Sequence, residues 1–434
     1  MTQKTMKLML MSIVMLIPGM IHAQQAASTM TLTLDEAQKY ALEHNYTLQN
    51  AALDVQKAEA AKWETFSTML PQVSGKFDYQ NMCGYEMNFG AMSIPLNPNG
   101  SLGVTASLAL TAQQVMGTLM SNISKEMSNI THKKTIQTTM SNVKNVYVSI
   151  LVMEDIVDLL DSSLANMESL ERTTQASVAV GAAEQIDADK LSVQVAQLRN
   201  SIASNRRSLT MLYNSMLLQL GADVNTKLVL TTKLDEILNI EQVAALSMGG
   251  FDIEKNYDYQ LLQQSEKLSK DQLTMAWLGF TPTLSVFYQY SWKTYFGKSE
   301  GMNMTPPNMV GASVSLPIFQ TGTRIAKIKE AKISHQETLN SKKQAEDGLQ
   351  VQFNQLCYDL ASAIETYQIQ KKNLEVTQRV LANTTEKYTY GRASNLEVTT
   401  ASTDIINAQS SYIQAVMSVL SAETSLENLL GQER

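Results

Sequence analysis

The stretch TPTLSVFYQYSW, residues 281–292, indicates how this chain folds, and LPQVSGKFDYQN at residues 70–81 repeats its pattern. In both stretches a proline ends a helical pattern, and the residues that follow alternate between apolar and polar side chains. Strict alternation places one set of side chains on each face of a strand. Strands of about ten residues with this alternation are typical of outer-membrane proteins.

Each of these strands is followed by a second alternating segment, over residues 102–110 and 310–316. The sequence therefore predicts β-hairpins at 71–112 and 282–317. Two hairpins in a soluble protein would be the simpler alternative, but their edges would need cover. Four strands are also fewer than the roughly eight that the smallest membrane barrel needs. We therefore expect other copies of the chain to cover the edges. Aromatic residues that would form an interfacial belt gather at one strand end: Tyr79, Tyr290, Trp292, Tyr295 and Phe296.

The rest of the chain repeats at nearly the same spacing. Asn45-Tyr46 and Asn256-Tyr257 each begin a helical segment, and Gly221 and Gly431 each end one. Each half is predicted to contain, in chain order, a helix, a strand, a loop, a second strand, a very long helix, a glycine turn and a final helix. The spacing between the two halves is much longer than the repeat unit of a solenoid protein. We expect one large unit built twice, in repeats at 24–221 and 251–434, with an equatorial connector at 222–250.

Long proline-free segments in each half carry heptad patterns of apolar residues. Sustained heptads predict helices that supercoil against neighbouring helices. The long helices are expected at 113–180 and 320–389, each about 100 Å long at 1.5 Å per residue. Shorter helices, packed end to end in pairs beside them, are expected at 41–70, 184–219, 254–280 and 394–430. The heptads alone also fit an ordinary solvent-exposed coiled coil.

Residues 1–23 have the features of an export signal. Lys4 and Lys7 precede the apolar run 8–17, and Ile21-His22-Ala23 is a suitable cleavage site. The run is shorter than the roughly 18 residues of a transmembrane helix. No other segment is long and apolar enough to be one, so entry into a membrane would require strands that close into a barrel.

Composition argues against an enzyme and against nucleic-acid binding. The net charge is -7, only 17% of residues are charged, and no basic patch is present. His44, His132 and His335 have no metal-ligand spacing, and no nucleotide-binding or nucleophile motif occurs. We expect no enzyme activity, no cofactor and no metal. Cys83 and Cys357 lie too far apart in the predicted fold to pair.

The chain resembles the TolC-type outer-membrane efflux proteins over nearly all of its mature length. The segments that carry the resemblance are residues 32–37 (LTLDEA), 70–73 (LPQV), 281–284 (TPTL), 316–322 (LPIFQTG) and 388–398 (YTYGRASNLEV). The resemblance implies a mainly helical homotrimer. Its four strands per chain would form a shared 12-stranded barrel in the outer-membrane lipid. An α-helical coiled-coil barrel would continue this as a tunnel through the periplasm of a Gram-negative bacterium.

The function implied by the resemblance is passive export. The chain would be the outer-membrane channel of a tripartite efflux or type I secretion system. A periplasmic adaptor protein and an inner-membrane pump would dock at the helical tips. The sequence does not identify the cargo.

The resemblance also implies a gate at the tips. Gly181 and Gly391 fit tight helical turns that need unusual backbone angles. Tyr388 matches the family's linking tyrosine, Asp187 its partner in the first hairpin, and Glu397 the first of two paired acids. We expect that neutralising Asp187 together with Glu397 raises the conductance of the pore.

Two positions depart from the family's gate pattern. Thr400 occupies the second acid position and Ala393 the linking arginine position, so Arg392 next to it is the candidate substitute. The simpler interpretation of Asp187 and Glu397 is that of first-turn acids stabilised by the helix dipole.

A secreted trimeric coiled-coil structural protein or adhesin is the alternative function. It would also carry a signal and heptads, but it would not need two membrane-type hairpins, each between two helices. A channel would show proteases only its external loops, at 81–100 and 296–308, whereas a fibre would be exposed throughout. The sequence does not determine the role of loop 81–100, for which plugging or capping the outer mouth is one hypothesis. An enzyme of the cell envelope is a third possibility, without a catalytic pair to support it.

Overall fold

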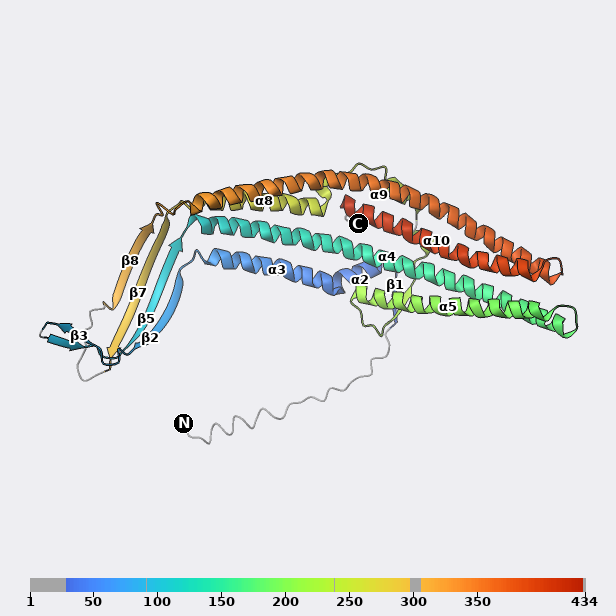
Figure 1. The fold of residues 1–434 in the computed structure, drawn as a ribbon, viewed down its shortest axis with the longest axis horizontal. Helices are drawn as coiled ribbons and strands as arrows, with labels where there is room; N and C mark the ends of the chain where they lie inside the picture. The colour runs from blue at the N-terminus through green and yellow to red at the C-terminus, as the bar shows by residue number, and fades with distance from the viewer. Residues whose placement is uncertain (1–28, 91, 238, 297–305, 432–434) are drawn as a thin grey trace, which may run out of the picture.

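The computed structural model describes residues 29–90, 92–237, 239–296 and 306–431. The expected signal at 1–23 and most of the expected loop 296–308 lie outside these residues. Strands form one end of an elongated molecule, and helices run from them to two hairpin tips at the other end (Figure 1). None of the helices in the described part of the chain is long and apolar enough to cross a membrane.

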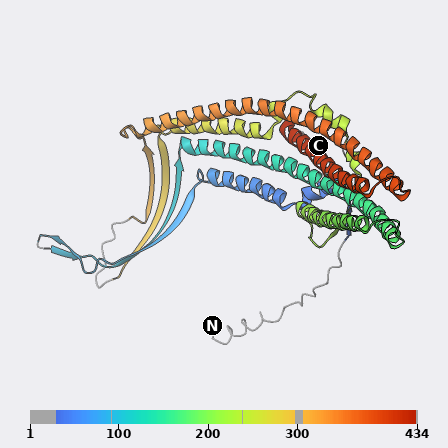
Figure 2. The same ribbon diagram turned by 45° about the vertical axis from the view of Figure 1, so that its right-hand side comes forward.

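The strands form one antiparallel sheet in the order β2-β5-β7-β8. These strands are β2 (Gln72–Gln80), β5 (Asn99–Leu110), β7 (Thr283–Tyr295) and β8 (Asn308–Ser315). Pairing of β5 with β7 joins the two predicted hairpins into a single sheet. The strands curve (Figure 2), and β2 and β8 are left as the two edges.

The register of the sheet places the apolar sets of all four strands on one face. Phe77 lies opposite Leu102, which lies opposite Trp292, and Tyr288 lies opposite Val310. This face is open in the single chain: Leu108 on it is half-buried, and the other large apolar side chains on it are 40% or more exposed. They are Val73, Phe77, Tyr79, Leu102, Val104, Leu110, Leu284, Val286, Tyr288, Tyr290, Trp292, Val310 and Val314.

The segment predicted as external loop 81–100 is not irregular throughout. It contains a small antiparallel hairpin of β3 (Glu86–Phe89) and β4 (Met92–Pro95), which projects beyond the sheet (Figure 1). Gly90, with φ 64°, lies in the turn between them. Alternation did not reveal these two strands, because each has only four residues, which is too short for the pattern to be recognised.

Two long helices run from the sheet to the tips, and each is accompanied by two shorter ones. The elements are α3 (Tyr46–Ser67), α4 (Ala112–Ala179), α5 (Gln185–Leu220), α8 (Tyr257–Leu278), α9 (Thr323–Thr389) and α10 (Asn395–Leu430). Near the sheet the order across the molecule is α3-α4-α8-α9 (Figure 1). Towards the tips, α5 packs on α4 and α10 packs on α9.

The predicted helix 41–70 is instead parts of two helices, because α2 (Leu34–His44) ends where α3 begins. Asn45 breaks the helix with extended backbone angles and caps α3 through its side-chain oxygen, which accepts from the amides of Thr47 and Leu48. Side-chain capping of this kind satisfies amides that have no partner within the helix. The periodicity runs through both helices, so it does not mark the break.

The repeated asparagines and glycines form the same joint twice. The side-chain amide of Asn45 donates to the carbonyl of Gln219, and that of Asn256 donates to the carbonyl of Leu429. The nearby glycines Gly221 and Gly431 adopt left-handed conformations. A Cβ on Gly221 would lie 2.2 Å from the carbonyl oxygen of His44, and one on Gly431 would lie 2.1 Å from that of Lys255. Each joint therefore locks one short helix onto the end of another.

The core follows the predicted heptads and extends beyond them. On α4 every heptad residue from Val143 to Met167 is buried or half-buried. Tyr147, Val148 and Val152 are also buried, outside the predicted stripe. Helix α4 contacts α2, α3, α5, α8 and α10, so it is covered on more sides than a single stripe indicates.

The connector packs against the middle of the helices. It contains β6 (Lys227–Leu230), α6 (Leu234–Ile237) and α7 (Ile240–Leu246), and the short helix η1 (Ile253–Lys255) follows it. Strand β6 pairs in parallel with β1 (Thr29–Leu32), which the sequence did not predict. The buried hydroxyl of Tyr147 donates to the carbonyl of Leu32 and accepts from the amide of Thr232.

Candidate functional site at the helical tips

Both helical tips end in the same type of turn. Gly181 and Gly391 have φ values of 74° and 67°, which is the left-handed region that favours glycine. One residue later, the amides of Ala182 and Arg392 each donate at 2.8 Å to carbonyls five residues back. This is the hydrogen-bond pattern of a Schellman motif, which reverses the chain after a helix. Open space surrounds both glycines, so only their backbone angles restrict substitution.

Tyr388 links the two hairpins close to the tips. Its hydroxyl lies 3.1 Å from that of Thr174 on α4, so α9 is hydrogen-bonded to α4 one turn before the reversal. Thr174 is only 2% exposed. The sequence did not single out Thr174, because a threonine within a long helix carries no motif.

Glu397 serves as part of a helix cap. Its carboxylate accepts from the amide of Ser394 at 2.7 Å, while the Ser394 hydroxyl accepts from the amide of Glu397. This reciprocal capping box begins α10. Asp187 lies half-buried in the first turn of α5, and Arg392 is exposed in the second tip. The four predicted gate residues thus lie within the two tips, and the Tyr388 hydroxyl bridges from the second hairpin to the first.

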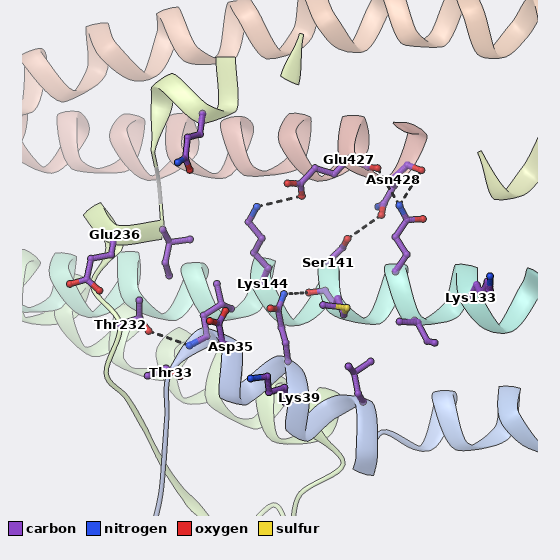
Figure 3. Close-up of a pocket in the computed structure, with 18 of the residues that line it drawn as sticks. Thr33, Asp35, Lys39, Lys133, Ser141, Lys144, Thr232, Glu236, Glu427 and Asn428 are labelled. Carbon is purple, nitrogen blue, oxygen red and sulfur yellow. Dashed lines mark hydrogen bonds and ion pairs between the residues drawn. The ribbon is translucent and has the colours of Figure 1, made fainter. Parts of the chain in front are cut away.

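A buried polar cluster ties α10 to α4 at mid-length. Lys144 forms ion pairs with Glu423 at 2.8 Å and Glu427 at 3.4 Å, and Ser141 donates to Asn428 (Figure 3). The cluster borders a cavity of about 1010 Å³ between α2, α4 and the connector. A buried ion pair contributes little net stability, because both charges lose their hydration. It can instead specify which residues of two helices pack against each other. The cluster therefore sets the register of α10 on α4.

The described residues hold no metal-ligand cluster. No group of three or more histidine, cysteine, aspartate or glutamate side chains is placed to bind a metal there. Cys83 and Cys357 are both free, as predicted. Burial raises the pKa of the Cys357 thiol.

Aromatic side chains mark both ends of the sheet. At the outer end the rings of Tyr79 and Phe296 lie 6.1 Å apart, in the predicted belt. At the helix end, exposed aromatic residues lie at the ends of α3 and α8 and just after them: Trp63, Phe66, Trp277 and Phe280. Two aromatic girdles flanking an outward apolar band are typical of outer-membrane barrels. The sequence pattern revealed only the outer girdle.

Residues 255–432 match the family model described as "Outer membrane efflux protein". The second half of the chain therefore matches an outer-membrane efflux family. No curated protein sequence matches this chain. Its fold resembles that of CusC at 18% identity and a TM-score of 0.73, over 95% of this chain and 96% of that one.

Two other outer-membrane protein structures share this fold. VceC of Vibrio cholerae is 13% identical with a TM-score of 0.69, over 92% of this chain and 96% of that one. The Campylobacter jejuni outer membrane channel CmeC is 14% identical with a TM-score of 0.72, over 92% of this chain and 85% of that one. The chain therefore has the fold of these outer-membrane proteins, and the family model that its second half matches describes efflux proteins.

Proposed function

We propose that three copies of the chain form a passive export conduit through the outer membrane and the periplasm. The observation that carries this proposal is the sheet, which has two open edges and one face of exposed apolar side chains. Open strand edges and exposed apolar side chains are both costly in water. Pairing β8 of one copy with β2 of the next would close a 12-stranded barrel and turn the apolar face to lipid.

The helices support the same head-to-tail closure. Exposed apolar residues lie along α9 at one side of the molecule, and others lie along α3 and α5 at the opposite side. On α9 they are Ile325, Ile333, Val351, Tyr358, Ile369, Val376 and Val380; on α3 and α5 they are Tyr46, Leu53, Trp63, Val193, Met211 and Leu218. Identical interfaces repeated around a three-fold axis would bury both rows and enclose a tunnel.

The tips are the proposed gate and docking surface. Each tip exposes one large apolar residue before its glycine and another five residues after it: Val180 and Ile186 in the first, Tyr390 and Leu396 in the second. These surfaces suit the adaptor of a tripartite efflux or type I secretion system, which an inner-membrane pump would join. Tyr388, Asp187, Arg392 and Glu397 would hold the tunnel closed beside them.

The two halves are proposed to be a tandem duplication, with units at 24–221 and 251–434 around the connector 222–250. The matching joints at Asn45 and Asn256 support this history, because each uses the same hydrogen bond and the same close approach of a glycine. The alternative of a secreted fibre or adhesin has no support in the family or the fold.

The mass of the native particle tests the conduit. The full chain would be extracted in detergent from the outer-membrane fraction, weighed by native mass spectrometry and inserted into planar bilayers. A trimer that conducts ions is the expected result. A monomer, or recovery in the soluble fraction without detergent, would contradict the shared barrel.

A further inference from the structure

Two exposed apolar patches lie where the sheet meets the helices, one beside each edge strand. The β8-side patch consists of Leu316, Ile318, Phe319 and Ile325, which are 56%, 90%, 84% and 70% exposed. The β2-side patch consists of Trp63, Phe66 and Leu70, which are 63%, 37% and 39% exposed. Ile318 and Phe319 are among the most exposed large apolar side chains of the described chain.

The patches lie at opposite edges of the same end of the sheet. The β8-side patch follows the last residue of β8, Ser315, and the β2-side patch precedes the first residue of β2, Gln72. Strands β5 and β7 lie between the two edges (Figure 1). At about 4.8 Å per strand, the edges are roughly 14 Å apart within one chain, so neither patch covers the other.

We propose that the β8-side patch of one copy packs against the β2-side patch of the next and forms a continuous apolar ring at the inner margin of the membrane. This inference rests on the proposed trimer and assigns the side chains that seal it. Closure of β8 on a neighbouring β2 brings the segments just beyond those strands together. Aromatic side chains buried at the centre of an interface commonly dominate its binding energy.

The local sequence favours a protein partner over lipid. Along β8 the lipid-facing side chains alternate with others, whereas Ile318 and Phe319 are consecutive and both exposed. Both residues lie beyond the end of β8, so their exposure is not part of the alternation that turns one set of strand side chains toward lipid. Arg324 donates to the carbonyl of Pro317 at 3.2 Å and lies over the ring of Phe280. The chain therefore fixes this segment while leaving its apolar side chains uncovered.

Disulfide cross-linking of the full-length protein in outer membranes tests the contact. The background is Cys83→Ser with Cys357→Ser, and the test pair is Leu70→Cys with Phe319→Cys. After mild oxidation we expect covalent dimers and trimers on non-reducing gels. A protein that carries only one of the two new cysteines should form neither dimers nor trimers through this contact. The matched control pair is Trp277→Cys with Phe319→Cys, because Trp277 is 59% exposed but lies on α8, which leads into the central strand β7 and not into an edge strand. This pair should give no covalent dimers or trimers.

A second variant measures the strength of the ring. Phe319→Ser is expected to lower the temperature at which the trimer dissociates in detergent by several degrees. Met248→Ser, which removes an 85% exposed side chain from the connector, should leave that temperature unchanged. A stable trimer with no covalent ladder and no response to Phe319→Ser would overturn the ring and assign both patches to lipid. A monomeric unmodified chain would overturn the proposed conduit as well.

Discussion

Tyr388 and Thr174 form an uncharged link between the two hairpins. The resemblance pointed to an acidic partner in the first tip, whereas the tyrosine hydroxyl meets a buried threonine hydroxyl on α4. A neutral hydrogen bond contributes about 1 kcal/mol, since both groups also bond to water when the link is open. In the proposed gate, the free energy of this hydrogen bond would favour the closed tip by a small amount.

Removing this hydrogen bond is expected to raise the fraction of channels whose tip is open. Losing about 1 kcal/mol in the closed state shifts the equilibrium roughly fivefold. Thr174→Val and Tyr388→Phe should each increase single-channel conductance or open time in planar bilayers, and the double variant should add little to either.

Thr173→Val is the matched control for this prediction. Thr173 is exposed, and its hydroxyl donates only to the carbonyl of Ser169 in its own helix. Conductance should therefore stay at the level of the unmodified protein. If Thr174→Val conducts like the control, the hydroxyl pair does not belong to the gate.

At the element scale, the paired joints decide how short helices meet end to end. Each joint has an asparagine that caps one helix and donates to the last turn of another, beside a left-handed glycine. These contacts require the backbones to approach more closely than any side chain allows. The joint explains why the asparagines and glycines recur at nearly the same spacing in both halves.

Gly221→Ala should destabilise the protein more than Gly181→Ala. Both glycines are left-handed, which costs about 1 kcal/mol for alanine. Only Gly221 approaches a backbone carbonyl, so its substitution adds roughly 2 kcal/mol of overpacking. The measurement is the melting temperature of the detergent-solubilised protein. Equal decreases for the two variants would show that close approach at the joint is unimportant.

At the scale of the whole molecule, the sheet register separates an apolar face from a more polar one, which are the lipid face and the lumen face of the proposed barrel. Val104 lies opposite Gly75 and Tyr290 on the apolar face, and its neighbour Thr105 points to the other side. The membrane position of the protein therefore depends on strand pairing between segments that are nearly 200 residues apart in sequence.

Val104→Arg is expected to reduce assembly in the outer membrane. Arginine on the lipid face near the bilayer centre costs about 2–4 kcal/mol, whereas the same side chain in the lumen remains hydrated. Thr105→Arg is the matched control and should assemble normally while altering ion selectivity. The amount of trimer in the outer-membrane fraction measures both effects. Equal assembly of the two variants would argue against the assignment of faces.

Local patterns in the sequence were sufficient for the four long strands, the long helices and the resemblance to a family. Alternation in 70–81 and 281–292 predicted the strands, and the heptads of 143–167 predicted the buried stripe of α4. Both patterns report which side of an element is apolar, which a short window of residues fully determines. Matching segments in the two halves then indicated an outer-membrane efflux protein.

Contacts between distant segments could not be obtained in this way. Only the tertiary structure showed the β5–β7 pairing, the parallel β1–β6 pair, the Tyr388–Thr174 link and the inner aromatic girdle. In each case the residues involved have no local signature, because their role comes from a partner far away in the sequence. The sequence by itself determined which faces are apolar, and the folded chain decided which of those faces meet each other and which stay open for lipid or for another copy.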